Sequence, residues 1–391
     1  MECLPQELVS NILTRLSAKE LSKCKCVCKP WLDLTTNPHF ITNHYVVYNN
    51  QEKHHLLVLR IPSFKPYISV FSWNTNEPKG LVSSQILKPP YECDSKYWTV
   101  IMGPCNGIFC LRGYQNNVMM NPSLRQFMSL PQSHFTVSDE VDVVEHYDIW
   151  FDDSHDDEDE NDGYLTARLY SLNSNSWRNI DAPPYYPLPC DSWSTSTIYT
   201  FVRNCCHWWD VVVDKSGNTG DWVLAFDMVN ELFRKIEVPK VQYSLSECYK
   251  TLVPFNESDT IGLIVYPRGL LDKCFDVWVM KDHWDEGSWI KKYSVGPVPV
   301  IYKLVGFYGS NQFLWKDRNK RLVLYEPENE NRKYLQFNEK GDSMRTARYM
   351  ESLVSLKRGN ESSRQCFSCS FVPGALLIHV HGKSYFTSKE K

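Results

Sequence analysis

No stretch of the 391-residue sequence approaches the ~20 consecutive apolar residues that a membrane-spanning helix needs. Residues 1–10 lack both the basic segment and the apolar segment of a secretory signal peptide. Signatures of catalysis are also missing, because the chain has no Gly-x-Ser-x-Gly, no glycine-rich phosphate loop and no His-Glu-x-x-His motif. We therefore expect a non-catalytic protein of the cytoplasm, or of the nucleus, that uses no cofactor and binds no membrane.

Metal sites and disulfide bonds are not expected either. The 14 cysteines of a chain without a signal peptide are typical of reduced, small apolar residues. Cys24 and Cys28 share a face of a helix while Cys26 points away, so the three cannot converge on one ion. Residues 366–381 contain a Cys-x-x-Cys pair and two histidines, but without the usual spacing of a zinc site. Residues 157–168 start like a calcium-binding loop, yet lack its glycine and its final glutamate.

The first forty residues carry the most regular apolar pattern of the chain. Leu8, Ile12 and Leu16 recur at helical spacing, which predicts a helix over about residues 6–16. Ser17 followed by Glu20 is a capping box, so a second helix should start there. A segment this short cannot bury so many apolar side chains in a core of its own. We expect its spare surface to bind a partner, the alternative being a helical appendage packed on the main domain.

This segment resembles the F-box, with a Leu-Pro start at residues 4–5 and an Asn-Pro-His-Phe end at residues 37–40. The resemblance implies a three-helix F-box over residues 1–44. In that family the F-box binds a Skp-type adaptor, which connects to a cullin scaffold and a RING subunit of a ubiquitin ligase. The residues expected to bind the adaptor are Leu4, Pro5, Leu8, Ile12, Leu13, Leu16, Leu21, Val27 and Trp31.

The rest of the chain predicts β structure built from a repeat. Aromatic residues make up 14% of the sequence, and no long amphipathic pattern follows residue 40. A short apolar strand, a polar turn and an aromatic anchor recur, with anchors 50, 56, 56 and 45 residues apart at Phe127, Trp177, Phe233, Trp289 and Tyr334. A weaker copy at residues 69–82 raises the count to about six.

This spacing matches kelch blades of ~50 residues. We predict an α+β protein: the F-box, then a mainly antiparallel β-propeller of about six kelch-like blades over residues 45–358, then an unassigned tail over residues 359–391. Because the Gly-Gly of true kelch repeats is missing, a curved two-sheet sandwich remains the alternative.

The repeats carry a second resemblance, to the F-box-associated domain of plant F-box proteins. Its opening is similar to residues 103–111, 121–127 and 130–131, and its later blades are similar to residues 174–178, 223–236 and 277–289. Residues 349–356 are similar to the S-locus F-box class of pollen proteins. The resemblance implies a substrate-recognition subunit of an SCF-type ligase, with pistil S-ribonucleases as clients in self-incompatibility.

Thirteen acidic residues and no Lys or Arg occupy residues 139–162. A solvated loop explains such a run, but it can also steer a basic partner protein, and it would repel nucleic acid. The residues expected to dock a basic client are Asp156, Asp157, Glu158, Asp159 and Glu160.

His207 beside Trp208 and Trp209 is the other conspicuous group. A histidine flanked by aromatic residues on a strand is more typical of a hydrogen-bonded core residue than of a catalytic base. If the two tryptophans line a central channel, the alternative function is a propeller lectin or a metabolite-sensing F-box protein.

Overall fold

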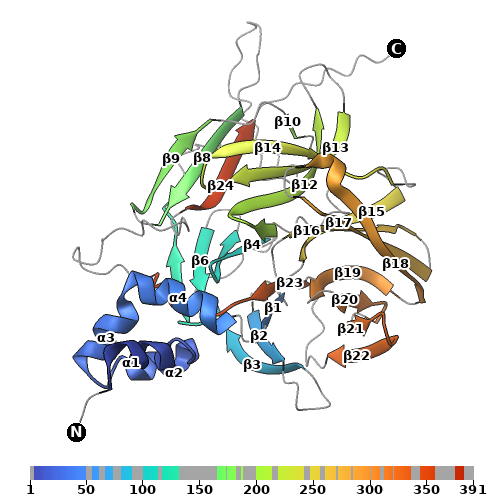
Figure 1. The fold of residues 1–391 in the computed structure, drawn as a ribbon. Helices are drawn as coiled ribbons and strands as arrows, with labels where there is room; N and C mark the ends of the chain where they lie inside the picture. Colours follow the sequence, from blue (N-terminus) through green and yellow to red (C-terminus); the bar gives the residue numbers. More distant parts are fainter. Residues whose placement is uncertain are drawn as a thin grey trace, which may run out of the picture. The chain divides into compact units, whose positions relative to one another are not determined.

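The computed structural model divides into two compact units (Figure 1). Unit 1 comprises Met1–Leu130 and Val300–Cys369, and unit 2 comprises Pro131–Pro299 and Ser370–Lys391. The structure describes residues 4–49, 55–60, 67–73, 81–89, 100–112, 117–131, 165–172, 174–181, 186–187, 200–213, 219–241, 247–255, 260–269, 272–282, 285–299, 301–308, 312–319, 321–335, 344–356 and 375–382.

Four helices precede the sheets of unit 1, one more than the three expected. They are α1 (Gln6–Leu13), α2 (Ala18–Cys24), α3 (Lys29–Thr36) and α4 (Pro38–Asn49). α4 continues past residue 44, where the F-box was expected to end. α1 stops at Leu13 and not near residue 16, because the N–H of Leu16 bonds the carbonyl of Leu13 in a tighter turn. The predicted capping box is confirmed, since the side chains and backbones of Ser17 and Glu20 satisfy each other at the start of α2.

Unit 1 contains three antiparallel sheets, in the strand orders β23-β1-β2-β3, β4-β5-β6-β7 and β19-β20-β21-β22. Strand β23 follows all the others in this unit, yet it pairs with β1 over six residues. The strands are β1 (His55–Arg60), β2 (Tyr67–Trp73), β3 (Leu81–Leu87), β4 (Val100–Cys105), β5 (Ile108–Arg112), β6 (Asn117–Asn121), β7 (Gln126–Ser129), β19 (Ile301–Tyr308), β20 (Gln312–Asp317), β21 (Leu322–Glu326), β22 (Asn331–Leu335) and β23 (Met344–Tyr349).

Unit 2 also contains three antiparallel sheets, in the orders β24-β8-β9, β10-β12-β13-β14 with β11 beside β12, and β15-β16-β17-β18. The short helix η4 (Glu286–Ser288) precedes β18. The strands are β8 (Leu165–Ser171), β9 (Ser176–Ile180), β10 (Tyr186–Pro187), β11 (Thr200–Val202), β12 (Cys205–Val213), β13 (Thr219–Asp227), β14 (Leu232–Glu237), β15 (Cys248–Phe255), β16 (Thr260–Pro267), β17 (Asp272–Met280), β18 (Trp289–Pro299) and β24 (Ala375–Gly382).

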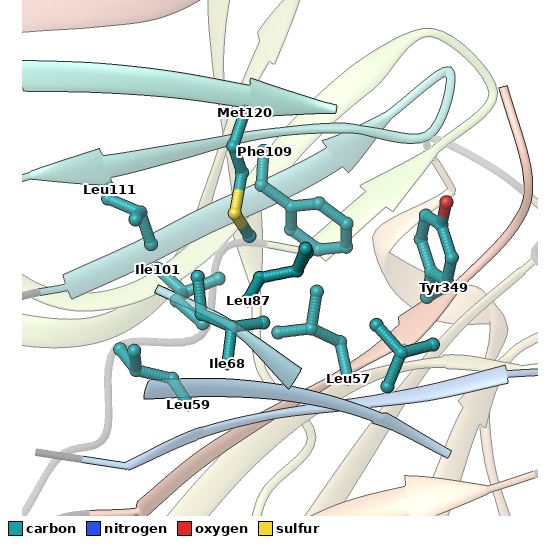
Figure 2. Close-up of a cluster of buried hydrophobic side chains, with 10 residues drawn as sticks. Leu57, Leu59, Ile68, Leu87, Ile101, Phe109, Leu111, Met120 and Tyr349 are labelled. Atoms are coloured by element: carbon teal, nitrogen blue, oxygen red, sulfur yellow. The ribbon is translucent and has the colours of Figure 1, made fainter. Parts of the chain in front are cut away.

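The core of unit 1 lies on both faces of the sheet that contains β1. Side chains alternate between the faces of a strand, so Leu57 and Leu59 join one cluster while Leu56 and Val58 join another. Figure 2 shows the first cluster, in which β1 and β2 meet β4, β5 and β6, with Phe109 at its centre. The second cluster connects β1 to strands β19–β22. Three sheets therefore pack face to face in series.

Unit 2 repeats this arrangement. On β13, Val223 and Ala225 pack toward β15 and β16, whereas Phe226 on the opposite face packs with Leu169 of β8. Successive sheets that pack face to face are typical of the blades of a propeller. The alternative of a two-sheet sandwich is wrong, because the described strands form six separate sheets.

The blade count differs from the expected number of about six. A propeller blade has four strands. Five of the sheets have four or five strands among the described residues, and the sheet β24-β8-β9 has three. The structure therefore has five complete blades. The third strand of the smaller sheet comes from the C-terminal tail, which the repeat pattern left unassigned.

The aromatic anchors Trp177, Phe233 and Trp289 lie at or next to the start of the last strand of their sheets, as the repeat predicts. They are half-buried and not buried. The indole N–H of Trp289 donates to the carbonyl of Glu237, 2.8 Å away at the end of the neighbouring sheet's last strand. Anchors at the rim of a sheet thus hold adjacent blades together while one edge of the ring stays in solvent.

Candidate functional site

The F-box helices form a small core of their own, completed by one residue from far along the chain. Leu13, Ala18, Leu21 and Phe40 are buried together, and Leu353 is buried among them. The first four come from α1, α2 and α4.

Large apolar side chains are exposed on α1 and on the segments that flank α1 and α2. The exposed fractions are 61% for Leu4, 50% for Leu8, 53% for Ile12 and 65% for Val27. Leu8 and Ile12 are one helical turn apart on α1, so they form a continuous ridge. Burying such a side chain contributes about 1.5–3 kcal/mol. These side chains would therefore gain free energy if a partner protein covered them.

The other residues expected to contact the adaptor divide into three groups. Pro5 is exposed and precedes α1 as its N-cap residue. Leu16 and Trp31 are half-buried against the F-box core. Leu13 and Leu21 are 2% and 0% exposed, so they lie inside the F-box core and not on its surface. The apolar pattern alone could not separate these groups, because inward and outward leucines both follow the helical period. Leu32, which is 41% exposed, was missed for the same reason.

His44 connects α4 to the segment that follows α1. Its ring nitrogen Nε2 donates to the carbonyl of Leu16 at 2.8 Å, and its ring stacks between those of Phe40 and Tyr48. Burial lowers the pKa of His44, and the bond to the Leu16 carbonyl opposes this effect only in part. The histidine is therefore neutral when the F-box is folded at neutral pH.

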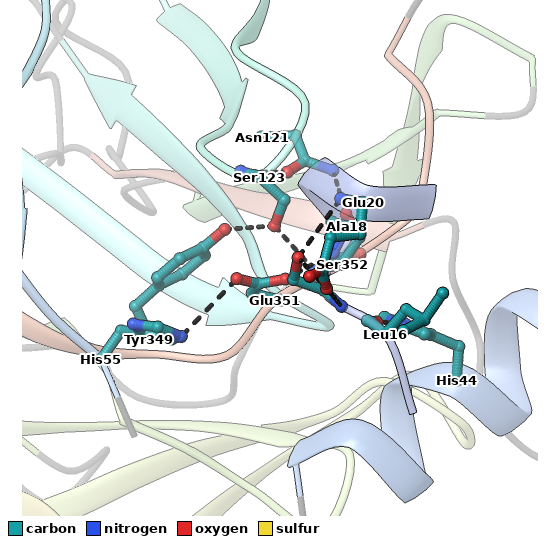
Figure 3. Close-up of polar contacts among 11 residues, drawn as sticks. Leu16, Ala18, Glu20, His44, His55, Asn121, Ser123, Tyr349, Glu351 and Ser352 are labelled. Carbon is teal, nitrogen blue, oxygen red and sulfur yellow. Dashed lines mark hydrogen bonds and ion pairs between the residues drawn. The ribbon is translucent and has the colours of Figure 1, made fainter. Parts of the chain in front are cut away.

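A second set of contacts joins the F-box to the sheet β4–β7 through residues 350–356, which we call the strap. Figure 3 shows Glu351 of the strap between α2 and β1. Its Oε2 accepts the backbone N–H of Ala18 at 2.6 Å, and its Oε1 lies 3.7 Å from Nε2 of His55. Sequence reasoning noted this segment only for its family resemblance. It gave no signal of these contacts, because the partners are more than 290 residues away in the chain.

The sheet β4–β7 holds the other side of the strap. The buried amide group of Asn121 donates to the carbonyls of Ser352 and Val354, at 3.1 and 2.7 Å. The hydroxyl of Ser123 accepts the N–H of Ser352 at 2.8 Å and bonds the hydroxyl of Tyr349. Burial raises the pKa of Tyr349, so its hydroxyl stays protonated in this network.

The remaining candidate features of the sequence give no second site among the described residues. The acidic residues Asp156–Glu160 and the Cys-x-x-Cys pair of residues 366–369 lie outside the described ranges. Where side chains are described, no group of three or more His, Cys, Asp and Glu residues is placed to hold a metal ion. Similarly, none of the described helices is long and apolar enough to cross a membrane.

His207, Trp208 and Trp209 take part in packing. His207 is fully buried, and its Nδ1 lies 3.3 Å from the carbonyl of Thr200. The ring of Trp208 meets Phe233 edge to face at 6.5 Å between centroids. Trp209 packs on the opposite face of β12, against the core it shares with β15 and β16. Both tryptophans are half-buried and pack between sheets, whereas the lectin or metabolite-sensing alternative expected them to line a central channel.

Comparisons with known proteins agree with this architecture. The F-box domain model matches residues 1–43, and the model of the F-box associated beta propeller domain matches residues 57–378. The F-box/kelch-repeat protein At3g23880 of Arabidopsis thaliana is 22% identical over 75% of this chain and 79% of its own length. F-box protein CPR1 of the same plant is 24% identical over 90% of this chain and 89% of its own.

Similarity to solved structures is much weaker. Apo AztD from Citrobacter koseri aligns with 77% of this chain and all of its own, at 8% identity and a TM-score of 0.30, which is too low to indicate a shared fold. The two domain models together span most of the sequence, in the order that the helices and sheets require. The chain belongs to the family of plant F-box proteins in which the F-box is followed by an F-box-associated β-propeller domain.

Proposed function

We propose that this protein is the substrate-recognition subunit of an SCF-type cullin-RING ubiquitin ligase. The F-box would bind a Skp-type adaptor, which connects to the cullin scaffold and the RING subunit, and the propeller would bind the client protein. The observation that carries the proposal is the exposed apolar ridge of Leu8 and Ile12 on α1, with Leu4 and Val27 also exposed near the ends of α1 and α2, in a helical segment that already has a core. The subunit itself is proposed to be non-catalytic and to act in the cytoplasm or the nucleus.

The adaptor contact can be tested on the exposed ridge alone. Leu8 and Ile12 are half or more exposed, so replacing both by Asp should leave the F-box folded. We expect Leu8→Asp/Ile12→Asp to weaken binding to a recombinant plant Skp-type adaptor by roughly 100-fold or more, because central apolar anchors dominate interface energies. Isothermal titration calorimetry measures this loss.

A matched control is Leu232→Asp, a charge placed on an equally exposed leucine of β14, outside the F-box. It should bind the adaptor as the wild type does. Adaptor affinity of the double variant equal to that of the wild type would refute this contact surface. Leu13 and Leu21 are proposed to support the surface from within and not to touch the adaptor.

For the client, we infer a basic protein, and the S-ribonucleases implied by the S-locus resemblance are the specific candidate. The support is the sequence of residues 139–162, whose thirteen acidic side chains give this segment a strong negative charge. Clustered carboxylates accelerate the encounter with cationic proteins. Selectivity among related clients would then come from shape and buried anchors elsewhere on the propeller.

A further inference from the structure

The strap, residues 350–356, joins three parts of unit 1 that are far apart in the sequence. It follows β23, it contacts α2 of the F-box, and it crosses the turn between β6 and β7. Leu353 enters the F-box core at 2% exposure, whereas Ser352, the preceding residue, bonds Ser123 after β6. Two consecutive strap residues therefore contact different parts of the unit, the F-box core and the β6–β7 turn.

Among the described residues the strap is part of no sheet, and side chains of the sheet β4–β7 bond its backbone. Asn121 donates to two strap carbonyls, and the side-chain carbonyl of Gln126 accepts the N–H of Leu356 at 2.7 Å. Buried backbone groups must be paired, and these three hydrogen bonds from two side chains therefore specify one path for the strap. Gly107 confirms how close the strap lies to the β4–β5 turn, because a Cβ there would be 2.5 Å from the carbonyl oxygen of Met350.

The contact with the F-box is equally specific. Ala18 is the first residue of α2, and the first N–H groups of a helix have no partner within the helix. Glu351 supplies that partner at 2.6 Å, and a carboxylate at a helix N-terminus also interacts favourably with the helix dipole. Leu124, next to Ser123 in the β6–β7 turn, packs against the same F-box core. The F-box is therefore held by an apolar contact and a charged one.

We propose that the strap is a positioning element, which fixes the orientation of the F-box relative to the sheet β4–β7, with Glu351 and Leu353 as its positioning residues. The proposal rests on the proposed function, because a ligase receptor must hold its client at a defined place relative to the adaptor. The adaptor-binding ridge and the orientation of the F-box are then separate properties, carried by different residues. A variant of Glu351 in the strap should therefore lose the fixed orientation of the F-box and retain its affinity for the adaptor.

The first test measures orientation on the full chain alone. Spin labels are attached through non-natural amino acids at the exposed positions Lys19 of α2 and Ser129 of β7, which avoids the 14 cysteines. Pulsed electron paramagnetic resonance then gives the distribution of distances between the two labels. We expect one narrow distribution for the wild type and a distribution roughly twice as broad or more for Glu351→Ala/Leu353→Ser. The contacts that remain at the β6–β7 turn are too few to hold the F-box in one orientation. An unchanged narrow distribution in this variant would overturn the proposal.

A milder variant keeps the test valid if the double variant unfolds. Glu351→Gln retains an acceptor for the Ala18 N–H, whereas Glu351→Ala removes it. Glu237→Ala removes an exposed glutamate of β14, far from this contact in the chain, and serves as the control. Amide exchange at Ala18 should rise roughly tenfold in Glu351→Ala, and stay near the wild-type rate in the other two variants. Equal exchange in all of them would contradict the assigned role of Glu351.

The second test uses the complex of this chain with adaptor, cullin and RING subunit. In this complex Glu351→Ala, which leaves the apolar F-box core with Leu353 in place, should bind the adaptor with wild-type affinity but modify its own lysines roughly tenfold more slowly, at more dispersed sites, because misplacement lowers the rate of group transfer. A wild-type site pattern and rate would overturn the proposal. If the wild type itself fails to bind the adaptor, the proposed function fails, while the distance measurement still decides the role of the strap.

Discussion

His44 illustrates at the residue scale how a buried titratable group ties the F-box together. Its side chain is fully buried, and burial lowers its pKa from the ordinary value of 6.5. In the unfolded chain the same histidine binds a proton more readily. Between the two pKa values the unfolded state therefore holds more protons, so stability falls as the pH falls below about 6.5. Below the lowered pKa of the folded state no further loss arises from this group.

The first prediction follows from this linkage. Lowering the pH from 7.5 to about 5 should decrease the free energy of local unfolding of α4, measured as amide protection relative to the unfolded chain at each pH. His44→Phe should remove most of this pH dependence while costing about 1–3 kcal/mol at neutral pH, because the Leu16 carbonyl loses its donor.

The exposed His39 of the same helix provides the control. His39→Gln should leave both the pH dependence and the protection of α4 unchanged. A pH dependence in His44→Phe equal to that of the wild type would show that other groups titrate with the F-box.

At the scale of elements, the strand β24 shows why local pattern and final pairing differ. β8 lies in the middle of its sheet. The next strand in the chain, β9, pairs with one edge of β8, and β24 pairs antiparallel with the other edge. A two-stranded hairpin is marginally stable in water, and an uncovered edge invites non-native pairing. A strand about 200 residues downstream therefore completes this sheet.

The corresponding prediction concerns truncation. A chain ending at residue 372 should show amide exchange in β8 accelerated by roughly tenfold or more, because the N–H groups that face β24 lose their partners. A chain ending at residue 382, which retains β24, is the control and should exchange as the full chain does. Similar protection of β8 in both truncated chains would argue that β24 contributes no stability there.

At the scale of the whole molecule, charge is distributed unevenly. The formal net charge is -4, although residues 139–162 alone carry thirteen acidic side chains, so the rest of the chain is net positive. Exposed charges act over about a Debye length, which is ~8 Å at physiological ionic strength. If the proposed client is basic, we expect the charge of this segment to affect the rate of association more than the stability of the propeller.

The prediction for this segment is kinetic. Replacing Asp156, Asp157, Glu158, Asp159 and Glu160 by their amides should slow association with a basic S-ribonuclease and flatten its dependence on salt, while the unfolding temperature barely changes. Surface plasmon resonance at low and physiological salt measures both rates. An unchanged association rate at both salt concentrations would exclude steering by these residues.

Several features of the fold were predictable because they depend on neighbours in the chain. The capping box at Ser17 and Glu20, and the helical stripe of α1, involve residues within one or two turns. The repeat of about fifty residues was predictable for the same reason, since most of the sheets are antiparallel meanders of strands that are close in the chain, with an anchor such as Trp289. The predicted number of helices and the predicted end of α1 were wrong. An α-helical turn and the tighter turn that follows Leu13 cannot be distinguished by the spacing of apolar residues alone.

The sequence by itself therefore determined an N-terminal helical segment, through apolar periodicity and capping, and an antiparallel β repeat after it, through the spacing of aromatic anchors, but not the number of helices or blades. Only the tertiary structure decided which part of the wide apolar face of α1 points outward, since Leu8 and Leu13 lie toward its two sides and are 50% and 2% exposed. It also decided the contact of Ala18 with Glu351, which are 333 residues apart. Pairing over such distances depends on the folded geometry of two separate modules, and no local pattern of residues encodes it.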